Sequence, residues 1–168
     1  MTDREPTAEP FSADDHGTPA PWSEALGRLG NNETYWLATV RPDGRPHLVP
    51  LLAVWVDAAV YFCAGAGSRK ARNLARNARC VLSVGGAVLD LVIEGEAAKV
   101  SDASTLDRVA DAYASAYDWN VTVRDGAFHD AEGAPTAGPP PYDVYKVTPR
   151  TAFGFGTDEA FSPTRWRF

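Results

Sequence analysis

The stretch Ala59–Val84, AVYFCAGAGSRKARNLARNARCVLSV, decides the fold of this chain. It begins with a short β-branched and aromatic run, breaks at Ala64–Gly67, continues with a helical pattern from Ser68 and ends in a second apolar run. This order predicts a strand, a glycine-rich turn, a short helix and another strand. Ser68 stands at the expected N-cap, because its hydroxyl can accept a hydrogen bond from a backbone N–H two or three residues later.

Cations occupy the first turn of this predicted helix. Arg69, Lys70 and Arg72 follow Ser68, although the N-terminal end of a helix favours Asp or Glu by about 0.3–1 kcal/mol each. An anion bound among the free N–H groups, the Ser68 hydroxyl and the basic side chains would remove this conflict. The pattern therefore indicates a phosphate site, and the alternative is a basic helix face that contacts only water.

Length and composition favour a single domain. The chain has 168 residues, of which 45% are hydrophobic, which is enough for one sizeable core. Its net charge of -6 argues against the broad basic face of a nucleic-acid-binding protein. Residues 1–20 are rich in Pro and acidic side chains, so we expect a disordered acidic tail before one domain at residues 21–168.

The cysteines and the N-terminal sequence indicate in which cellular compartment the protein is expected. Cys63 and Cys80 each lie in an apolar run without metal-ligand spacing, which favours buried free thiols. No apolar run is long enough to span a bilayer, and the acidic N-terminus lacks the features of a signal peptide. We expect a cytoplasmic protein that binds neither nucleic acid nor a membrane.

Apolar periodicity and turn residues predict further elements on both sides of the central stretch. The expected strands are residues 34–40, 47–56, 59–63, 80–84, 89–100, 142–147 and 151–155, the last two forming a hairpin. A short helix is expected at residues 21–29, and the longest helix at residues 102–117. Because regular βαβ alternation is missing, we predict a mainly β (α+β) fold, an antiparallel barrel with helical additions.

Three segments together resemble the split-barrel flavin-binding family typified by pyridoxamine 5′-phosphate oxidase and its deazaflavin-dependent relatives. They are TYWLATVRPDGRPHLVPL (34–51), YFCAGAGSRKARNLARNARCVLSV (61–84), and VYKVTPRTAFGFG (144–156) with the terminal TRWRF. The resemblance implies a six- to seven-stranded antiparallel split β-barrel, with a short phosphate-binding helix and one longer packing helix. The tail lacks the Arg-Leu-x-Pro ending of the vitamin-oxidising enzymes, so a true pyridoxamine phosphate oxidase is not expected.

The resemblance also implies a cofactor site. Arg69 and Lys70, assisted by Ser68, would hold the phosphate of FMN or of the deazaflavin coenzyme F420. Backbone at residues 38–40 and 49–51, which include Thr39 and Pro50, would lie against the ring.

His47 would lie near the ring or the substrate; the alternative reading of this residue is a hydrogen-bonded structural histidine. The implied assembly is a homodimer with cofactor sites at the interface, where Trp166 and Arg167 reach the partner's cofactor. The strand at residues 47–56 independently favours an obligate dimer, because it is apolar on both faces.

A flavin or deazaflavin carries the hydride on its own ring, so the protein needs only to bind, orient and tune it. We expect an FMN- or F420-dependent oxidoreductase that transfers hydride between the cofactor and a small conjugated substrate. No catalytic residue is assigned, and the histidines suggest no metal site. The alternatives are a non-catalytic flavin-, deazaflavin- or haem-binding protein and a dimerisation module with a vacant site.

Residues 118–141 form a long Gly- and Pro-rich stretch. Loops of this length in a compact domain are usually lids, binding loops or linkers. Because Trp119 and Phe128 are large and apolar, we expect a lid over the substrate side of the cofactor, and the alternative is a surface excursion packed on its own side chains.

Overall fold

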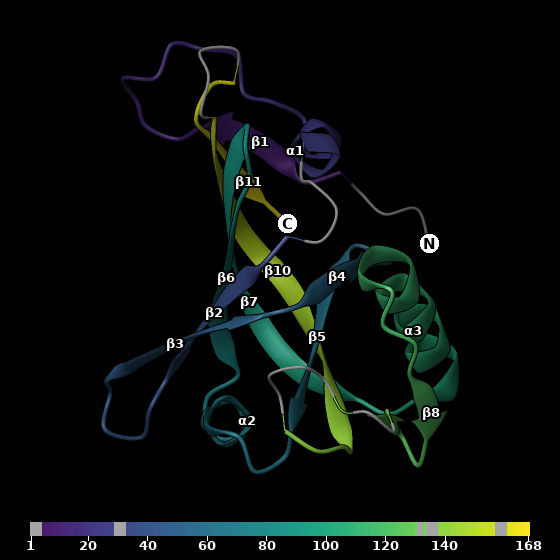
Figure 1. Ribbon diagram of the computed structural model, residues 1–168. Helices are drawn as coiled ribbons and strands as arrows, with labels where there is room; N and C mark the ends of the chain where they lie inside the picture. Colours follow the sequence, from purple (N-terminus) through teal and green to yellow (C-terminus); the bar gives the residue numbers. More distant parts are fainter. Residues whose placement is uncertain (1–4, 29–32, 131–132, 134–137, 157–160) are drawn as a thin grey trace.

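The computed structural model describes residues 5–28, 33–130, 133, 138–156 and 161–168. The described part contains eleven strands in one sheet and three helices (Figure 1). The helices are α1 (Trp22–Arg28), α2 (Arg69–Leu74) and α3 (Ala103–Tyr117). The strands are β1 (Thr7–Pro10), β2 (Tyr35–Val40), β3 (Pro46–Leu51), β4 (Ala53–Val56), β5 (Ala59–Gly65), β6 (Arg79–Gly85), β7 (Leu89–Val100), β8 (Thr122–Arg124), β9 (Ala127–His129), β10 (Tyr142–Gly156) and β11 (Thr164–Arg167).

The sheet is antiparallel throughout and follows the order β1-β11-β10-β7-β6-β2-β3, while β4 pairs with β5 and β5 pairs with β10. One edge of β10 pairs with β5 in its first half and with β11 in its second half; the other edge pairs with β7 along nearly its whole length. The sheet therefore divides along β10, which confirms the predicted antiparallel split barrel. Short strands at both ends raise the number of strands above the six or seven expected.

β10 corrects the prediction of a closing hairpin at residues 142–155. The chain continues through Pro149 as a single strand of 15 residues, with an irregular register against β7 between Pro149 and Thr151. A bulge accommodates a residue that cannot donate a ladder hydrogen bond, and it bends the strand instead of ending it. Pro149, whose presence suggested a turn, lies where β10 changes its pairing partner from β5 to β11.

The central stretch separates two hydrophobic cores. Val60 and Phe62 on one face of β5 join the core inside the barrel, whereas Ala59 and Tyr61 on the other face join a second core beneath α3. This alternation follows from the period of two in a strand. β5 is therefore buried on both faces, and the glycine turn and the short α2 follow directly from it.

The helix predicted at residues 102–117 is confirmed as α3, which lies beside β4 and β5 (Figure 1). The Asp102 carboxylate caps it by accepting the Thr105 N–H at 2.9 Å. The hydroxyls of Tyr113 and Tyr117 donate to the carbonyls of Leu52 and Ala53 at 2.9 and 2.8 Å. These bonds hold the chain where the strand predicted at residues 47–56 breaks into β3 and β4.

The predicted disordered tail is wrong for the part of it that the structure describes. β1 pairs with β11, from Thr7 opposite Arg167 to Pro10 opposite Thr164. The Ala20 N–H donates to Thr164 Oγ1 at 3.0 Å, and the Ala20 carbonyl accepts from the Trp166 indole at 2.8 Å. Sheet pairing with the distant C-terminus orders a segment whose own composition suggested disorder.

The lid prediction is also wrong for the first part of the 118–141 stretch. β8 and β9 form a hairpin, Phe128 is fully buried, and the Trp119 indole donates to Asp130 Oδ2 at 2.7 Å. Trp119 also makes edge contacts with the rings of Tyr113 and Tyr142. This part is the packed excursion given as the alternative, and residues 131–132 and 134–137 lie outside the described residues.

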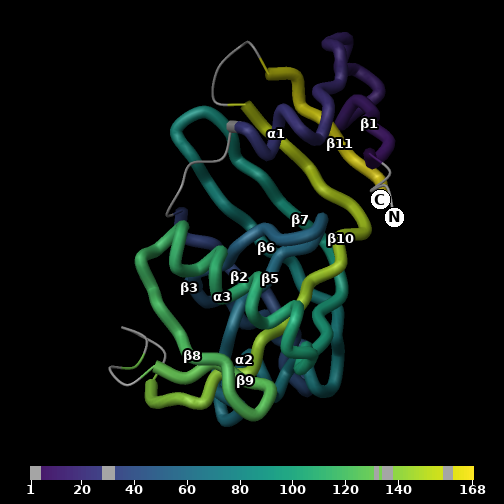
Figure 2. Tube along the Cα trace, turned by 90° about the vertical axis from the view of Figure 1, so that its right-hand side faces the viewer, coloured from purple at the N-terminus to yellow at the C-terminus, as the bar shows by residue number. Residues whose placement is uncertain are grey.

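The two ends of the molecule are formed by different elements and side chains. Figures 1 and 2 place β1, β11 and α1 at one end and α2 at the other. Trp22 of α1 contacts the rings of Trp55, Trp166 and Phe168 at centroid distances of 5.0–5.5 Å, which closes the first end with aromatic side chains. Within the described residues, no helix is long and apolar enough to cross a membrane.

Candidate functional site

The predicted turn and short helix are confirmed at the second end. Ser68 caps α2, its hydroxyl accepting the Ala71 N–H at 3.3 Å. No acidic residue occupies the first turn. Ala71, Asn73 and Leu74 are buried on the barrel side, while Arg69 and Arg72 are exposed.

A buried polar chain ties α2 to the β2–β3 hairpin. The Asn73 amide donates to Thr39 Oγ1 at 2.9 Å, and Thr39 Oγ1 lies 3.4 Å from His47 Nδ1. Thr39 and Asn73 are only 2% and 1% exposed. Thr39 and His47 are register partners in β2 and β3, which fixes their side chains on the same sheet face. The structure thus brings together the predicted residues Thr39, His47, Arg69 and Lys70 at one end of the barrel.

The electrostatics of this end are strongly positive. Partial burial, then the charges of Arg41, Arg69 and Lys70, lower the pKa of the His47 imidazole below its ordinary value. Burial lowers the pKa of the Lys70 ammonium. We call Thr39, His47, Ser68, Arg69, Lys70 and Asn73 the phosphate cluster.

The cations at this end form no ion pair within the described residues. Elsewhere in the described residues, six cations pair with Asp or Glu, namely Arg45, Lys99, Arg108, Arg124, Arg150 and Arg167, whereas Lys146 and Arg165 do not. At this end the unpaired cations are Arg41, Arg69, Lys70, Arg72, Arg76 and Arg79. Among them Arg41 and Lys70 are half-buried, the other four are exposed, and Arg79 alone lies opposite a carboxylate, that of Glu96. Gathering unpaired cations costs charge repulsion, which a bound anion would relieve.

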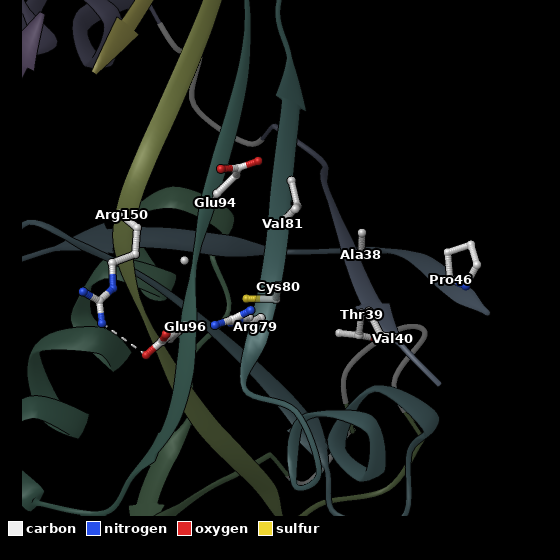
Figure 3. Close-up of a pocket in the computed structure, with 11 residues that line it drawn as sticks. Ala38, Thr39, Val40, Pro46, Arg79, Cys80, Val81, Glu94, Glu96 and Arg150 are labelled. Atoms are coloured by element: carbon white, nitrogen blue, oxygen red, sulfur yellow. Dashed lines mark hydrogen bonds and ion pairs between the residues drawn. The ribbon is translucent and has the colours of Figure 1, made fainter. Parts of the chain in front are cut away.

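A groove of about 480 Å³ lies on the outward face of the sheet next to this cluster. Figure 3 shows the side chains that line it, which come from β2, β3, β6, β7 and β10. Ala38, Val40, Pro46 and Val81 give it an apolar wall, and Arg79, Glu94, Glu96 and Arg150 give it a charged one. Arg150 contacts Glu96 at 3.4 Å. Thr39 borders both the groove and the phosphate cluster, but its side chain lies with His47 on the sheet face opposite to Val40, so the two surfaces lie on opposite faces of β2 and meet at Thr39.

This arrangement fits a phosphorylated planar cofactor. Arg and Lys side chains without acidic neighbours are the donors that phosphate oxygens need. The groove lies within the usual size range of ligand pockets, about 300–1,000 Å³. Glu94 and Glu96 would repel a second anionic group there, so the groove suits the uncharged ring better than the phosphate.

Three predicted site residues line neither the groove nor the phosphate cluster. Pro50 is on the sheet face opposite to His47, which is the face that carries the groove, and it is exposed opposite Trp36. Trp166 is fully buried, with its indole N–H donated to Ala20, so the prediction that it reaches a partner's cofactor is wrong. Arg167 of β11 pairs with Glu9 of β1 at 3.1 Å, and these two strands lie at the end of the molecule away from α2 (Figures 1 and 2). Trp166 and Arg167 therefore stabilise the end of the molecule formed by α1, β1 and β11.

Asn73 and Arg41 were missed by sequence analysis. Asn73 stands beside Leu74 on the face of α2 that should be apolar, and a polar residue at such a position signals a buried hydrogen bond. Arg41 follows β2 at the hairpin turn, and only the fold brings it near Arg69 and Lys70.

The thiols and histidines add no second centre. Cys63 and Cys80 are free, as predicted, and burial raises the pKa of each to about 12, so neither is a ready nucleophile. In the part of the chain that the structure describes, no group of three or more His, Cys, Asp or Glu side chains could hold a metal ion.

Solved structures share this fold at low sequence identity. Conserved hypothetical protein Rv2991 from Mycobacterium tuberculosis has a TM-score of 0.64 and 22% identity, covering 86% of this chain and 88% of its own. A FAD-binding protein from Mesorhizobium loti has a TM-score of 0.56 and 19% identity, covering 96% and 99%. An F420 reductase has a TM-score of 0.53 and 22% identity, covering 75% and 93%. At these identities the likeness shows the fold alone.

No curated protein matches the chain. The sequence model of the family described as pyridoxamine 5'-phosphate oxidase matches residues 23–155, which is more than half of the chain, and the chain therefore belongs to this family.

Proposed function

We propose that this protein binds FMN or coenzyme F420 and acts as an oxidoreductase that transfers hydride between the cofactor and a small conjugated substrate. Its family includes flavin- and F420-binding proteins. The observation that carries the proposal is the set of unpaired cations at the α2 end of the barrel, where Thr39 borders an apolar groove. In this proposal the cations take the phosphate and the groove takes the planar ring.

Each residue of the phosphate cluster has a role in this proposal. Arg69 and Lys70 hold the phosphate by charge-assisted hydrogen bonds. Asn73 and Thr39 fix α2 against β2, so the cations do not move when the ligand arrives. The ring, when bound, supplies the hydride chemistry; the chain's task is to orient the ring in the groove and to exclude water from one of its faces.

A spectrum of the purified protein tests the proposal. We expect a flavin or deazaflavin absorption band that is retained on gel filtration, or that appears on reconstitution with FMN or F420. A haem Soret band would favour the haem-binding alternative instead, and no binding of any of these chromophores would leave only the dimerisation module. Reduction of the bound cofactor, followed by reoxidation with a panel of conjugated acceptors, then separates an enzyme from a carrier.

The titration of His47 should respond to the cofactor phosphate. In the free protein, burial and the three nearby cations hold the pKa of His47 below 6.5. A bound phosphate screens those cations, so we expect a higher pKa in the complex. Linkage then makes the protein take up a proton on binding. The His47 ring signals followed by NMR against pH, with and without FMN, measure both values.

The same proton linkage gives the direction in which folding stability changes with pH. Below pH 6.5, His47 binds a proton in the unfolded chain more readily than in the folded protein. The contribution of His47 to stability therefore falls as the pH drops toward its folded pKa. Arg69→Ala should raise the pKa of free His47, whereas Arg72→Ala, which lies on the same helix and does not perturb His47, should leave it in place. A His47 pKa at or above 6.5 in the free protein contradicts this account.

We also propose a homodimer joined through the outward face of β2 and β3. Trp36, Val40 and Leu48 are 45%, 40% and 59% exposed there. Register places Pro50 opposite Trp36 and Leu48 opposite Ala38, so these apolar side chains share one face. Such a contiguous apolar surface is unusual on a monomer. A second copy seated on it would also cover the groove and complete the cofactor site.

A further inference from the structure

We infer that Asn73 sets the tautomer of His47 through the Thr39 hydroxyl, so that neutral His47 offers the ligand an Nε2–H donor. This inference rests on the proposed function, because it gives His47 a role in the proposed cofactor site. Asn73 and Thr39 are then positioning residues, which act on the ligand through His47. The ligand must present an atom that accepts a hydrogen bond at this point.

The direction of the hydrogen bonds is set at Asn73. Its amide nitrogen donates to Thr39 Oγ1 at 2.9 Å. The Thr39 hydroxyl therefore accepts one hydrogen bond and keeps its own hydrogen to donate. Because Thr39 is only 2% exposed, bulk water cannot take that hydrogen. A buried hydroxyl needs a partner inside the protein.

The Nδ1 atom of His47 is the acceptor for that hydrogen. It lies 3.4 Å from Thr39 Oγ1, and the Thr39 hydroxyl makes no further hydrogen bond among the residues that the structure describes. A ring nitrogen that accepts a hydrogen bond carries no hydrogen, and a neutral imidazole carries one hydrogen in all. The hydrogen of neutral His47 is therefore on Nε2.

The Nε2–H group is open to a ligand. Nε2 makes no hydrogen bond within the described part of the chain, and the buried side-chain nitrogens that lack a partner there belong to other residues, so Nε2 reaches the surface. Since Nδ1 faces Thr39, Nε2 points in a different direction from the ring. The charges of Arg69 and Lys70 act on the same imidazole. A ligand that these cations bind through oxygen atoms has acceptors for the Nε2–H.

Reversing the hydrogen bond at Asn73 tests the inference on the full chain. Asn73→Asp replaces the amide by a carboxylate of nearly the same shape, which can only accept hydrogen bonds. The Thr39 hydroxyl then donates to this carboxylate, and its oxygen accepts a hydrogen from His47 Nδ1. We expect the Nε2–H tautomer in the unsubstituted protein and the Nδ1–H tautomer in Asn73→Asp. The nitrogen chemical shifts of the ring, measured by NMR at about pH 8.5 where imidazole is neutral, distinguish the two.

Two controls separate the hydrogen-bond chain from the added charge. Asn77→Asp adds the same charge just after α2, at an exposed side chain whose oxygen already accepts the Arg79 N–H, and should keep the Nε2–H tautomer. Thr39→Ser keeps the hydroxyl and should also keep this tautomer, whereas Thr39→Val removes the hydroxyl and should give a mixture of both. Circular dichroism spectra of each variant check the fold. If Asn73→Asp does not fold, the two Thr39 variants decide, and equal tautomers in them contradict the inference.

Saturation with FMN at the same pH identifies the nitrogen that meets the ligand. We expect the Nε2 shift of the unsubstituted protein to change, while Nδ1 keeps the shift of an acceptor nitrogen. An Nδ1–H tautomer in the unsubstituted protein, or an unchanged tautomer in folded Asn73→Asp, overturns the inference and leaves the proposed function standing. FMN binding without a change at Nε2 overturns the ligand contact. If the tautomers are as expected but neither FMN nor F420 binds, the proposed function fails and the tautomer assignment stands.

Discussion

Replacing Arg69 and Lys70 together by Ala should weaken cofactor binding by about 10²- to 10⁴-fold. Each side chain contributes a charge-assisted hydrogen bond to phosphate, worth about 1.5–3 kcal/mol, and 1.4 kcal/mol corresponds to a factor of ten. The effect is this large because neither cation has a carboxylate to pair with in the described structure, so neither gives up an existing ion pair on binding. Quenching of flavin or deazaflavin fluorescence measures the dissociation constant.

The control for this experiment removes the same charge from another place. Arg108→Ala/Arg167→Ala deletes two cations that pair with Asp57 and Glu9, away from α2. We expect its cofactor affinity to stay within about threefold of the unsubstituted protein, since exposed ion pairs contribute little. If Arg69→Ala/Lys70→Ala binds the cofactor as tightly as this control does, the phosphate assignment is wrong.

The double variant should also be at least as stable as the unsubstituted protein when no cofactor is present. Removing mutually repelling cations beside His47 relieves unfavourable charge interactions in the folded state. A stability loss in the free protein, with cofactor affinity unchanged, would instead assign these cations to the fold.

The parts predicted correctly from sequence are those set by local chemistry. The Ser68 cap, the short α2 and the turn at Pro42-Asp43-Gly44 depend on residues within a few positions of one another. The grouping of cations at α2 was visible for the same reason. Their lack of carboxylate partners was not, because ion pairs in this protein join segments distant in sequence, such as Arg108 with Asp57.

The errors come from pairing over long sequence separations. β1 exists because Thr7 lies opposite Arg167, and no property of residues 7–10 alone predicts that partner. Trp166 near the C-terminus looked available to a ligand, but Gly154 lets its ring pack closely against β10, where an added Cβ would lie 2.6 Å from the indole. Arg41 entered the candidate site only through the hairpin that turns it toward α2.

Leu48→Glu should convert the proposed dimer into a monomer. Leu48 is 59% exposed in the single chain and lies near the centre of the apolar face of β2 and β3. Burying a Leu side chain contributes about 1.5–3 kcal/mol, and a two-fold interface buries two copies. The substitution loses this contribution twice and places two carboxylates in the contact. We expect the dissociation constant to rise by at least about 10²-fold, measured by light scattering across a concentration series.

Val88→Glu is the matched control, because Val88 is also a large exposed apolar residue, 37% exposed, but lies in the turn between β6 and β7. It should stay dimeric, and both variants should keep the far-UV spectrum of the unsubstituted protein.

Cofactor affinity then decides whether the partner completes the site. Leu48→Glu leaves the phosphate cluster intact, so a weakened but measurable affinity would show that the ring has lost its contact with the partner subunit. A monomeric unsubstituted protein at micromolar concentration, or an unchanged dimer in Leu48→Glu, would show that this face has another occupant.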